Sequence, residues 1–552
     1  MNMARLAAAA LVGPALLAAV PAASAAPGTG VQVPVKEGSL SNGLKVLVVE
    51  RHELPTVACV VKFRVGSVDE KPGQTGIAHI LEHMLFKGTD VWGTTDYAKE
   101  KPLLDRTEAL YQSILAARAA LPLDLRRDTE TFDAVVRVSH ALAVAEAAPE
   151  ERRNAELVET LRREAKPLQA LGPAVRLVFD LESEFCRVQE EADRFVVEDE
   201  DWAILDRNGA AGLNASTGND STQYYYSLPA NRLELWALIE SGRMRRPVLR
   251  QFYKERDVIM EERRMRIDNS PQGVMFEAVN ALAFSAHPYG WPVIGWASDI
   301  ATVSRTQVEE FFKTHYAPNR AIACVVGDVK FAEVMALLER YFGDIPRQPE
   351  PEPVVTVEPV QKGERRSTVK YPDLQVPQVA VSYHRPAVGH PDFYVLDVIT
   401  GVLSGGNSSR LPRDLLYRGQ VGQVSSNNGD SLYPDLFTFF GTPLPGKTLD
   451  ELEAAVADQV RRLRDEPVEE KELTRVRNQN AASMIRNMES NMGLAQTLTS
   501  FERLYRWDYI NTYQQRIEAV TAADVQRVAR KYFQDDNKSV VRVVPADAAP
   551  AK

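Results

Sequence analysis

The sequence contains few cysteines, and their spacing excludes the usual cysteine-based sites. Only three occur in 552 residues, at Cys59, Cys186 and Cys324, and no Cys-x-x-Cys pair is present. Neither a thiolate zinc site nor a disulfide framework is therefore indicated. Cys59 and Cys324 lie in apolar, strand-like runs, where a buried and unreactive thiol is expected. One disulfide in an exported protein would still be compatible with this pattern.

Long apolar runs are also missing. Beyond Leu6–Val20, no stretch approaches the roughly 20 apolar residues that a membrane-spanning helix needs. That first run follows Arg5 and precedes an Ala-Ser-Ala tripeptide at 23–25, which is typical of a cleaved signal peptide. We therefore expect residues 1–25 to be removed and the mature chain, beginning near Ala26, to be periplasmic or secreted. An uncleaved anchor is the alternative.

An excess of positive charge is absent too. The formal net charge is -10, from 65 basic and 75 acidic residues, which argues against general nucleic-acid binding. A solvated acidic surface explains this charge more simply. The apolar fraction of 45% and the charged fraction of 25% are ordinary for a globular protein. At 552 residues the chain is long enough for more than one hydrophobic core.

The segments that are present divide the mature chain into two parts. Strand-like runs surround an Asn42-Gly43 turn near its start. Residues 98–196 are rich in Glu, Arg, Ala and Leu, with apolar positions at three- and four-residue steps, which predicts a helical insertion. A proline-rich, charged stretch then marks a linker. We expect a first domain at 26–345, the linker at 346–366 and a second domain at 367–547.

The insertion carries no motif with recognisable chemistry. It is interpreted as a solvated helical appendage, with a docking or gating element as the alternative.

Two similar segments indicate an internal duplication. In the first half, Ser304 precedes a helical pattern that leads to the apolar run 321–326. In the second half, Thr521 precedes a like pattern that leads to 539–544. Ser and Thr are favoured helix caps, so both segments are predicted to be a capped helix followed by a buried strand. The chain is therefore expected to contain two related halves.

The densest chemical signal is the pentapeptide His79-Ile80-Leu81-Glu82-His83. On a helix, residues three and four apart share a face, so His79, Glu82 and His83 project together. Two imidazoles at this spacing can chelate zinc, and a carboxylate beside the ion can act as a general base toward water. The chain has only eight histidines, so chance would produce this arrangement in on the order of one in a hundred such sequences. The pattern is the H-x-x-E-H motif of inverted zinc peptidases.

A catalytic zinc site needs a third protein ligand, and a second acidic helix contains candidates. Glu255 and Glu262 are seven residues apart, nearly two helical turns, and therefore face the same way. Glu261 is displaced by about 100° and faces elsewhere. Acidic residues on a helix are more often only solvated, and the spacing alone does not decide between the two interpretations.

The motif and its continuation, Met84–Thr89, resemble the signature of the M16 (pitrilysin or insulinase) metallopeptidases, and most of all the shorter branch related to mitochondrial processing peptidase. The resemblance covers nearly the whole mature chain except the insertion. The other matching segments are Leu213–Ala215, Glu255–Glu262, His287–Gly290, Pro292–Gly295 and Tyr316–Asn319.

The resemblance implies both a fold and a set of roles. The fold is α+β, in two similar halves that each have an antiparallel sheet with helices packed on it (LuxS/MPP-like), closing around a chamber for peptides or unfolded segments. The implied zinc ligands are His79, His83 and Glu262. Glu82 is then the general base, and Glu255 orients a ligand or substrate group. Asn214 and Ala215 are implied to lie on an edge strand that binds peptide by β-augmentation.

This chain departs from the family pattern in two ways. The distance between the motif and Glu262 is about a hundred residues longer than usual, which the insertion explains. The Arg and Tyr, seven apart, that active members receive from a C-terminal half correspond here to Leu416 and Gln423. Their absence predicts a homo- or heterodimer in which a paralogous subunit supplies the pair. An alignment that uses Arg418 is the alternative.

The sequence therefore predicts an exported zinc metalloendopeptidase with Zn²⁺ as its cofactor. A non-catalytic subunit or peptide-binding scaffold of the same fold is the alternative. A zinc enzyme with a non-peptide substrate is disfavoured by the likeness around Asn214.

Overall fold

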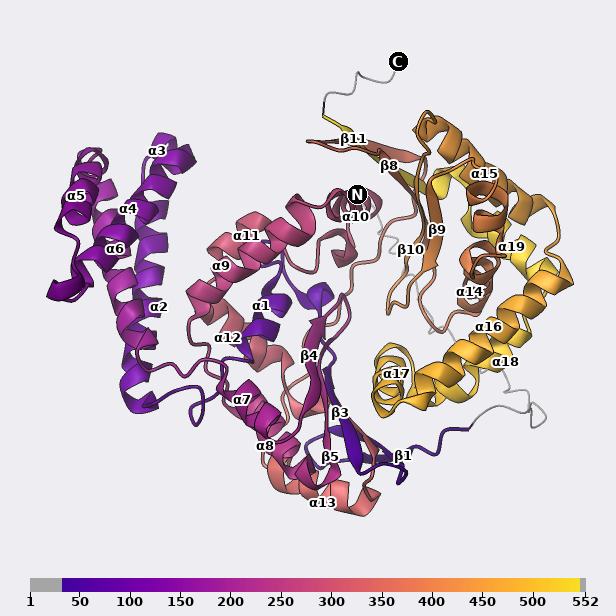
Figure 1. Cartoon of the computed structure of the whole chain (residues 1–552), viewed down its shortest axis with the longest axis horizontal. Helices are drawn as coiled ribbons and strands as arrows, with labels where there is room; N and C mark the ends of the chain where they lie inside the picture. Colours follow the sequence, from indigo (N-terminus) through magenta and orange to yellow (C-terminus); the bar gives the residue numbers. More distant parts are fainter. Residues whose placement is uncertain (1–31, 547–552) are drawn as a thin grey trace, which may run out of the picture.

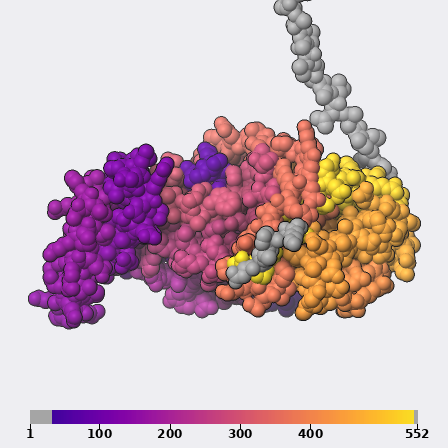
Figure 2. Space-filling view, turned by 90° about the horizontal axis from the view of Figure 1, so that it is seen from above, coloured from indigo at the N-terminus to yellow at the C-terminus, as the bar shows by residue number. Residues whose placement is uncertain are grey.

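The computed structural model describes residues 32–546, so the expected signal peptide at 1–25 lies outside the described residues. Two α+β lobes lie side by side, and a helical arm projects from the first lobe (Figures 1 and 2). Across residues 32–546, every helix is too short or too polar to cross a lipid bilayer.

The first lobe is built on a six-stranded sheet with the order β1-β2-β6-β3-β5-β4. The Asn42-Gly43 turn joins its first two strands, and Gly43 has the positive φ of 91° that favours glycine there. The strands of this sheet are β1 (Lys36–Ser39), β2 (Lys45–Glu50), β3 (Thr56–Phe63), β4 (Ala211–Thr217), β5 (Thr222–Pro229) and β6 (Ala321–Gly327).

Helices cover one face of this sheet and form the larger apolar core of the lobe with it. A π-helical turn, Arg264–Asp268, follows α9. The helices of the lobe are α1 (Ile77–Met84), α7 (Glu200–Arg207), α8 (Leu233–Arg245), α9 (Phe252–Arg263), α10 (Pro271–Ala283), α11 (Ala297–Thr302), α12 (Arg305–His315) and α13 (Phe331–Phe342).

The helical arm corresponds to the predicted insertion and has a small apolar core of its own. Its helices change near Pro122 and Pro149, where proline ends a helical run. The root of α2 and α6 packs against the first lobe, whereas the far end stands away from the body (Figure 2). The helices of the arm are α2 (Tyr97–Ala119), α3 (Leu123–Arg127), α4 (Thr129–Ala147), α5 (Ala155–Gln169) and α6 (Pro173–Asp193).

The second lobe repeats the strand order of the first. Its five strands follow the order β7-β11-β8-β10-β9, so β2, β6, β3, β5 and β4 each have a counterpart. The elements of this lobe are β7 (Arg365–Tyr371), β8 (Gln378–Arg385), β9 (Gln423–Asn428), β10 (Asp435–Thr442), β11 (Lys538–Pro545), α14 (Pro391–Ser404), α15 (Leu449–Asp465), α16 (Glu470–Glu489), α17 (Asn491–Leu504), α18 (Tyr513–Glu518) and α19 (Ala522–Tyr532).

The α+β fold with two similar halves is confirmed, with one correction to the sheets. Each sheet contains one parallel pair, β2 with β6 and β7 with β11, and is therefore mixed rather than purely antiparallel. The predicted capped helices are confirmed as well. The hydroxyls of Ser304 and Thr521 accept hydrogen bonds from the backbone N–H three residues on, and the helices that they cap lead into β6 and β11.

Each lobe contributes a helix to the other lobe's sheet. α17 lies on the second face of the first sheet, where Leu494 and Leu498 pack against Val60 and Ile322. Reciprocally, α10 lies on the second face of the other sheet, where Met275 and its neighbours pack against β8 and β11 (Figure 1). Because the central strands β3 and β6 are covered on both faces, their sequences are almost continuously apolar.

One carboxylate of the linker binds a turn of the first lobe. Residues 346–364 form no helix or strand, but Glu358 accepts hydrogen bonds of 2.9, 2.9 and 3.0 Å from the backbone N–H groups of Ser285, Ala286 and His287. The Ser285 hydroxyl donates a fourth, at 2.7 Å.

The three cysteines are free thiols, and two of them are buried in the first sheet.

Candidate metal centre

The helix that carries the H-x-x-E-H motif, α1, has its start fixed by neighbouring groups. It begins after Gly76, where φ is 89° and a Cβ would lie 2.4 Å from the Ile294 carbonyl oxygen, so only glycine fits. The Glu70 carboxylate accepts hydrogen bonds of 2.9 Å from the N–H groups of Gly76 and Ala78. The first N–H groups of a helix have no partner within the helix, so these two hydrogen bonds to Glu70 anchor the start of α1.

The structure brings three of the predicted site residues together. The imidazole rings of His79 and His83 lie one turn apart, with centroids separated by 4.8 Å. From the neighbouring α9, Glu262 Oε2 lies 3.7 Å from His79 Nε2 and 3.4 Å from His83 Nε2. Ligand atoms of the three residues all fall within 4.8 Å of one another. Within residues 32–546, this is the one such cluster of His, Cys, Asp or Glu side chains.

The donor set and its spacing fit a zinc ion. Zinc takes imidazole nitrogens and carboxylate oxygens at about 2.0–2.2 Å, so atoms that share one tetrahedral ion stand about 3.3–3.6 Å apart. The observed separations of 3.4 and 3.7 Å are close to this value. Glu262 Oε2 is buried and accepts no hydrogen bond in the described part of the chain. Its other oxygen, Oε1, is occupied by Arg266 Nη1 at 2.8 Å. A buried acceptor without a donor, facing two imidazoles, is the environment that a cation completes.

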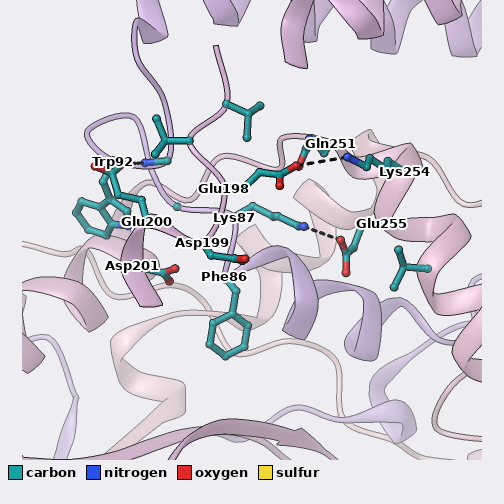
Figure 3. A pocket seen from close by; sticks show the side chains of 15 residues that line it. Phe86, Lys87, Trp92, Glu198, Asp199, Glu200, Asp201, Gln251, Lys254 and Glu255 are labelled. Carbon is teal, nitrogen blue, oxygen red and sulfur yellow. Dashed lines mark hydrogen bonds and ion pairs between the residues drawn. The ribbon is translucent and has the colours of Figure 1, made fainter. Parts of the chain in front are cut away.

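Glu255 lies behind this cluster, on the same face of α9 as Glu262. Its Oε1 is 2.9 Å from His83 Nδ1, and its Oε2 is 2.6 Å from Lys87 Nζ (Figure 3). Burial opposes ionisation of Glu255, but its hydrogen bonds with His83 and Lys87 outweigh burial and lower its pKa to about 2. Glu255 is therefore an ionised carboxylate that orients the His83 ring.

The titration of the two histidines differs because their neighbours differ. Burial, together with the charge of His83, lowers the pKa of His79 to about 4, so the His79 imidazole is neutral near pH 7. Burial also opposes the charged form of His83, but Glu255 and Glu262 outweigh it and raise the pKa of His83 to about 9. Without a bound cation, His83 is therefore protonated near pH 7. The pKa of Glu82 is raised by burial, against a hydrogen bond from Thr217 that lowers it.

The predicted substrate-binding residues lie on an edge of the first sheet. β4 pairs only with β5, and the strand order ends there. Asn214 is exposed, Ala215 is half-buried, and the Asn214 side-chain oxygen accepts a hydrogen bond of 2.8 Å from the Ala215 N–H. β4 also packs against α1, so this free edge runs beside the metal cluster.

A recess of about 260 Å³ adjoins Glu255 and Lys87 (Figure 3). Its walls come from the segment after α1, from α9 and from residues 196–201, which follow the insertion. Several of its charges are paired, since Lys254 Nζ lies 3.5 Å from Glu198 and Asp201 lies 2.6 Å from Arg243. The segment in which the chain returns from the insertion to the first lobe thus forms part of the space beside the metal cluster.

The C-terminal segment that the family resemblance would make catalytic carries neither a cation nor a phenol at the expected positions. Leu416 is half-buried at the end of a π-helical turn, and Gln423 is the exposed first residue of β9. The alternative, Arg418, is exposed and lies 3.8 Å from Asp414. Arg410, earlier in this segment, is buried and forms a two-point ion pair with Glu472.

Three residues at the centre were not found by sequence reasoning. Lys87 and Arg266 each lie four residues after a predicted ligand, a spacing that could have marked them as helix-face partners of His83 and Glu262. Thr217 contacts Glu82 from β4, and no sequence spacing relates the two.

Two family models match this chain, and together their matches include residues of both lobes. The model described as Insulinase (Peptidase family M16) matches residues 45–101, which include the H-x-x-E-H motif, and the Peptidase M16 inactive domain model matches residues 302–480. The chain belongs to the M16 family. The second model is named an inactive domain, and the H-x-x-E-H motif does not recur in the residues that it matches.

Relatives of this M16 protein include named zinc proteases. The zinc protease PqqE of Helicobacter pylori is 29% identical over 348 residues, which cover 62% of this chain and 78% of that protein. A probable mitochondrial-processing peptidase subunit beta of Arabidopsis thaliana is 25% identical over 358 residues, covering 61% of this chain and 66% of the plant protein.

Solved structures confirm the M16 fold. A protease from Helicobacter pylori matches with a TM-score of 0.70 at 24% identity and covers 93% of this chain and 100% of that chain. The periplasmic protease PqqL from Escherichia coli matches with a TM-score of 0.61 at 16% identity, over 95% of this chain but only 50% of that chain.

Proposed function

We propose that this M16 protein is a zinc-dependent endopeptidase, in which His79, His83 and Glu262 hold the metal. The observation that carries the proposal is the convergence of these three side chains, two of them from the motif helix and one from α9, on ligand atoms within 4.8 Å of one another. The naming of relatives as zinc proteases supports the choice of metal.

The residues around the centre would have different roles in peptide hydrolysis. Zinc, when bound, would polarise the scissile carbonyl and make a water molecule more acidic. Glu82 Oε1, which no described residue binds, would take the proton from the attacking water and return it to the leaving nitrogen. Glu255, held by Lys87, keeps the His83 ring turned toward Glu262.

The substrate would be a peptide or an unfolded segment added to β4 as an extra strand. An extended peptide satisfies the backbone groups of a free sheet edge, and Asn214 and Ala215 lie on such an edge beside α1. A folded protein could not present an unpaired strand in this way, so the chemistry favours flexible substrates.

We further propose that a second M16 subunit completes the site. Leu416 and Gln423 provide neither a positive charge nor a phenol, so an Arg and a Tyr from a homo- or heterodimeric partner would stabilise the oxyanion. The two lobes of this chain are already joined by two apolar clusters, so the chamber would close between this chain and its partner. The PqqL chain is about twice as long as its matching region, which is compatible with two such units in one polypeptide.

Export to the periplasm or outside the cell belongs to the same proposal. The Leu6–Val20 pattern supports it, and so does the likeness in fold to PqqL, a periplasmic protease of Escherichia coli. N-terminal sequencing of the protein purified from its own cells tests this, with a start near Ala26 expected.

A non-catalytic M16 subunit is the second candidate, favoured by the missing Arg and Tyr. One experiment separates the two. Zinc content and cleavage of a mixed-peptide pool are measured for the protein alone and together with any co-purifying homologue. Glu82→Gln should keep the metal and lose cleavage. Equal cleavage by this variant contradicts the mechanism, a protein without metal contradicts the site, and zinc without cleavage in either preparation supports the non-catalytic subunit.

A further inference from the structure

The Glu82 carboxylate is held from strand β4 by one hydroxyl. Thr217, the last residue of β4, donates a hydrogen bond from Oγ1 to Glu82 Oε2 at 2.5 Å. Glu82 itself is buried, with 9% of its surface exposed. In the described part of the chain, this is the one hydrogen bond that the Glu82 carboxylate accepts, so Thr217 alone fixes which way it points.

The β4–β5 hairpin gives Thr217 a rigid base. Thr217 pairs with Thr222, which is fully buried and donates from Oγ1 to the Val65 carbonyl oxygen at 3.1 Å. The turn between the two strands is closed by a hydrogen bond of 2.9 Å from Gly218 N–H to the Ser221 carbonyl oxygen. A β-branched residue at a paired strand position has few χ1 rotamers, so the Thr217 hydroxyl has a defined direction.

The same turn is fastened to the second lobe. Asp220 Oδ2 accepts a hydrogen bond of 3.0 Å from the Leu432 N–H of the second lobe, and its Oδ1 accepts one of 2.6 Å from the Tyr289 hydroxyl of the first lobe. Arg503 Nε, at the end of α17, donates to the Asp220 carbonyl oxygen at 2.7 Å. Asp220, which contacts the second lobe, is therefore only three positions along the chain from Thr217, whose hydroxyl holds Glu82.

From these contacts we infer that Thr217 is a positioning residue for the general base. The inference rests on the proposed function, because it takes Glu82 as that base. Thr217 occupies Oε2, which leaves Oε1 to receive the proton from water. Because Thr217 belongs to the strand that would bind the peptide, the alignment of Glu82 depends on the strand that carries the substrate.

The test compares two substitutions of one hydroxyl. Thr217→Val keeps the shape and the β-branch but removes the donor, whereas Thr217→Ser keeps the donor. With zinc-loaded protein and any co-purifying partner, kcat for a cleaved peptide should fall about tenfold to a hundredfold in Thr217→Val, with KM unchanged. Thr217→Ser should recover most of kcat. Ser216→Ala is the matched control, since the Ser216 hydroxyl contacts Gln223 at 3.0 Å on the other face of β4.

A double substitution identifies the route of the effect. If Thr217 acts only through Glu82, Thr217→Val should not lower the residual rate of Glu82→Gln any further. A further fall, an unchanged kcat in the single variant, or a rise in KM alone overturns the inference. If Thr217→Val does not fold, Thr217→Ala is compared with Thr217→Ser in its place.

A crystal structure of the Thr217→Val variant gives a readout that does not need activity. The Glu82 carboxylate should turn away from β4, while His79, His83 and Glu262 keep their places. A Glu82 side chain that stays in its original position overturns the inference, whether or not the unaltered protein cleaves peptides. Absence of cleavage by the unaltered protein would count against the proposed function alone.

Discussion

His83 Nδ1 lies 2.9 Å from Glu255 Oε1, and this contact turns the other ring nitrogen, Nε2, toward Glu262. Lys87 holds the second oxygen of Glu255 at 2.6 Å, so the carboxylate is fixed at both ends. A ligand histidine whose ring is held in this way loses little freedom when a metal binds. Glu255 does not reach the metal position, but through this contact it should affect the affinity for the metal.

Replacing Glu255 by Gln should weaken zinc binding. The substitution keeps the size of the side chain but removes its charge and one acceptor, so the His83 ring is oriented less firmly. Loss of such an outer contact typically costs about 10- to 100-fold in metal affinity. Competition with a chelator measures the change, and Glu261→Gln is the control, because Glu261 is exposed and pairs with Arg264. Equal zinc affinities for the two variants would contradict the role of Glu255.

Zinc binding near pH 7 should release about one proton from the ligands. His83, with a pKa of about 9, is protonated in the metal-free protein, and a ligand imidazole must be neutral. His79, with a pKa of about 4, is already neutral and contributes none. The apparent affinity should therefore rise with pH up to about 9 and then level off. Titration calorimetry in buffers of different ionisation enthalpy counts the protons, and a count of zero would show that Glu255 and Glu262 do not hold a proton on His83.

The parts of the centre that the sequence predicts are those set by local geometry. His79, Glu82 and His83 share a face because a helix turns every 3.6 residues, and Glu255 and Glu262 do so for the same reason. The caps at Ser304 and Thr521 are local in the same sense, since each hydroxyl reaches an N–H three residues along the chain.

The remaining features depend on contacts between distant segments. The Thr217 contact with Glu82 spans 135 residues and depends on the strand order, which no local pattern determines. The parallel pairing of β2 with β6 is non-local in the same way. The apolar runs of β3 and β6 predict that both faces are covered, but the covering helix, α17, comes from the other lobe. The sequence therefore predicts that something packs on the second face of the first sheet, but it does not identify α17 as that element.

Truncation of one α17 side chain should destabilise the junction of the lobes. Leu498 is fully buried between α17 and the first sheet, so Leu498→Ala removes apolar contacts and leaves a cavity. Such substitutions typically cost about 2–5 kcal/mol. Urea unfolding measures the loss, and Ile485→Ala on α16, where the side chain is 48% exposed, should stay within about 0.5 kcal/mol of the unaltered protein. Equal midpoints for the two variants would mean that α17 does not stabilise the first sheet.

The contact between the linker and residues 285–287 should weaken in acid because it depends on the ionised carboxylate of Glu358. Burial opposes the charge of Glu358, but the hydrogen bonds from Ser285, Ala286 and His287 outweigh burial and lower its pKa to about 2. Its ordinary value is 4.5, so the attached state gains stability that is fully present above pH 4.5 and is lost as the pH falls toward 2. At about 1.4 kcal/mol for each pH unit between these values, the contribution is about 3.5 kcal/mol at most.

Hydrogen exchange at the three backbone amides that Glu358 binds can measure this contribution directly. Glu358→Gln keeps the shape but offers one acceptor to four donors, so exchange at these amides should be faster than in the unaltered protein at pH 6. The ratio of the two exchange rates at each pH cancels the intrinsic dependence of exchange on acidity. That ratio should be constant above pH 4.5 and shrink below it, because the Glu358 carboxyl group of the unaltered protein then becomes protonated in the detached state, where its pKa is 4.5. A ratio that stays constant down to pH 3 would mean that the charge of Glu358 does not hold the linker in place.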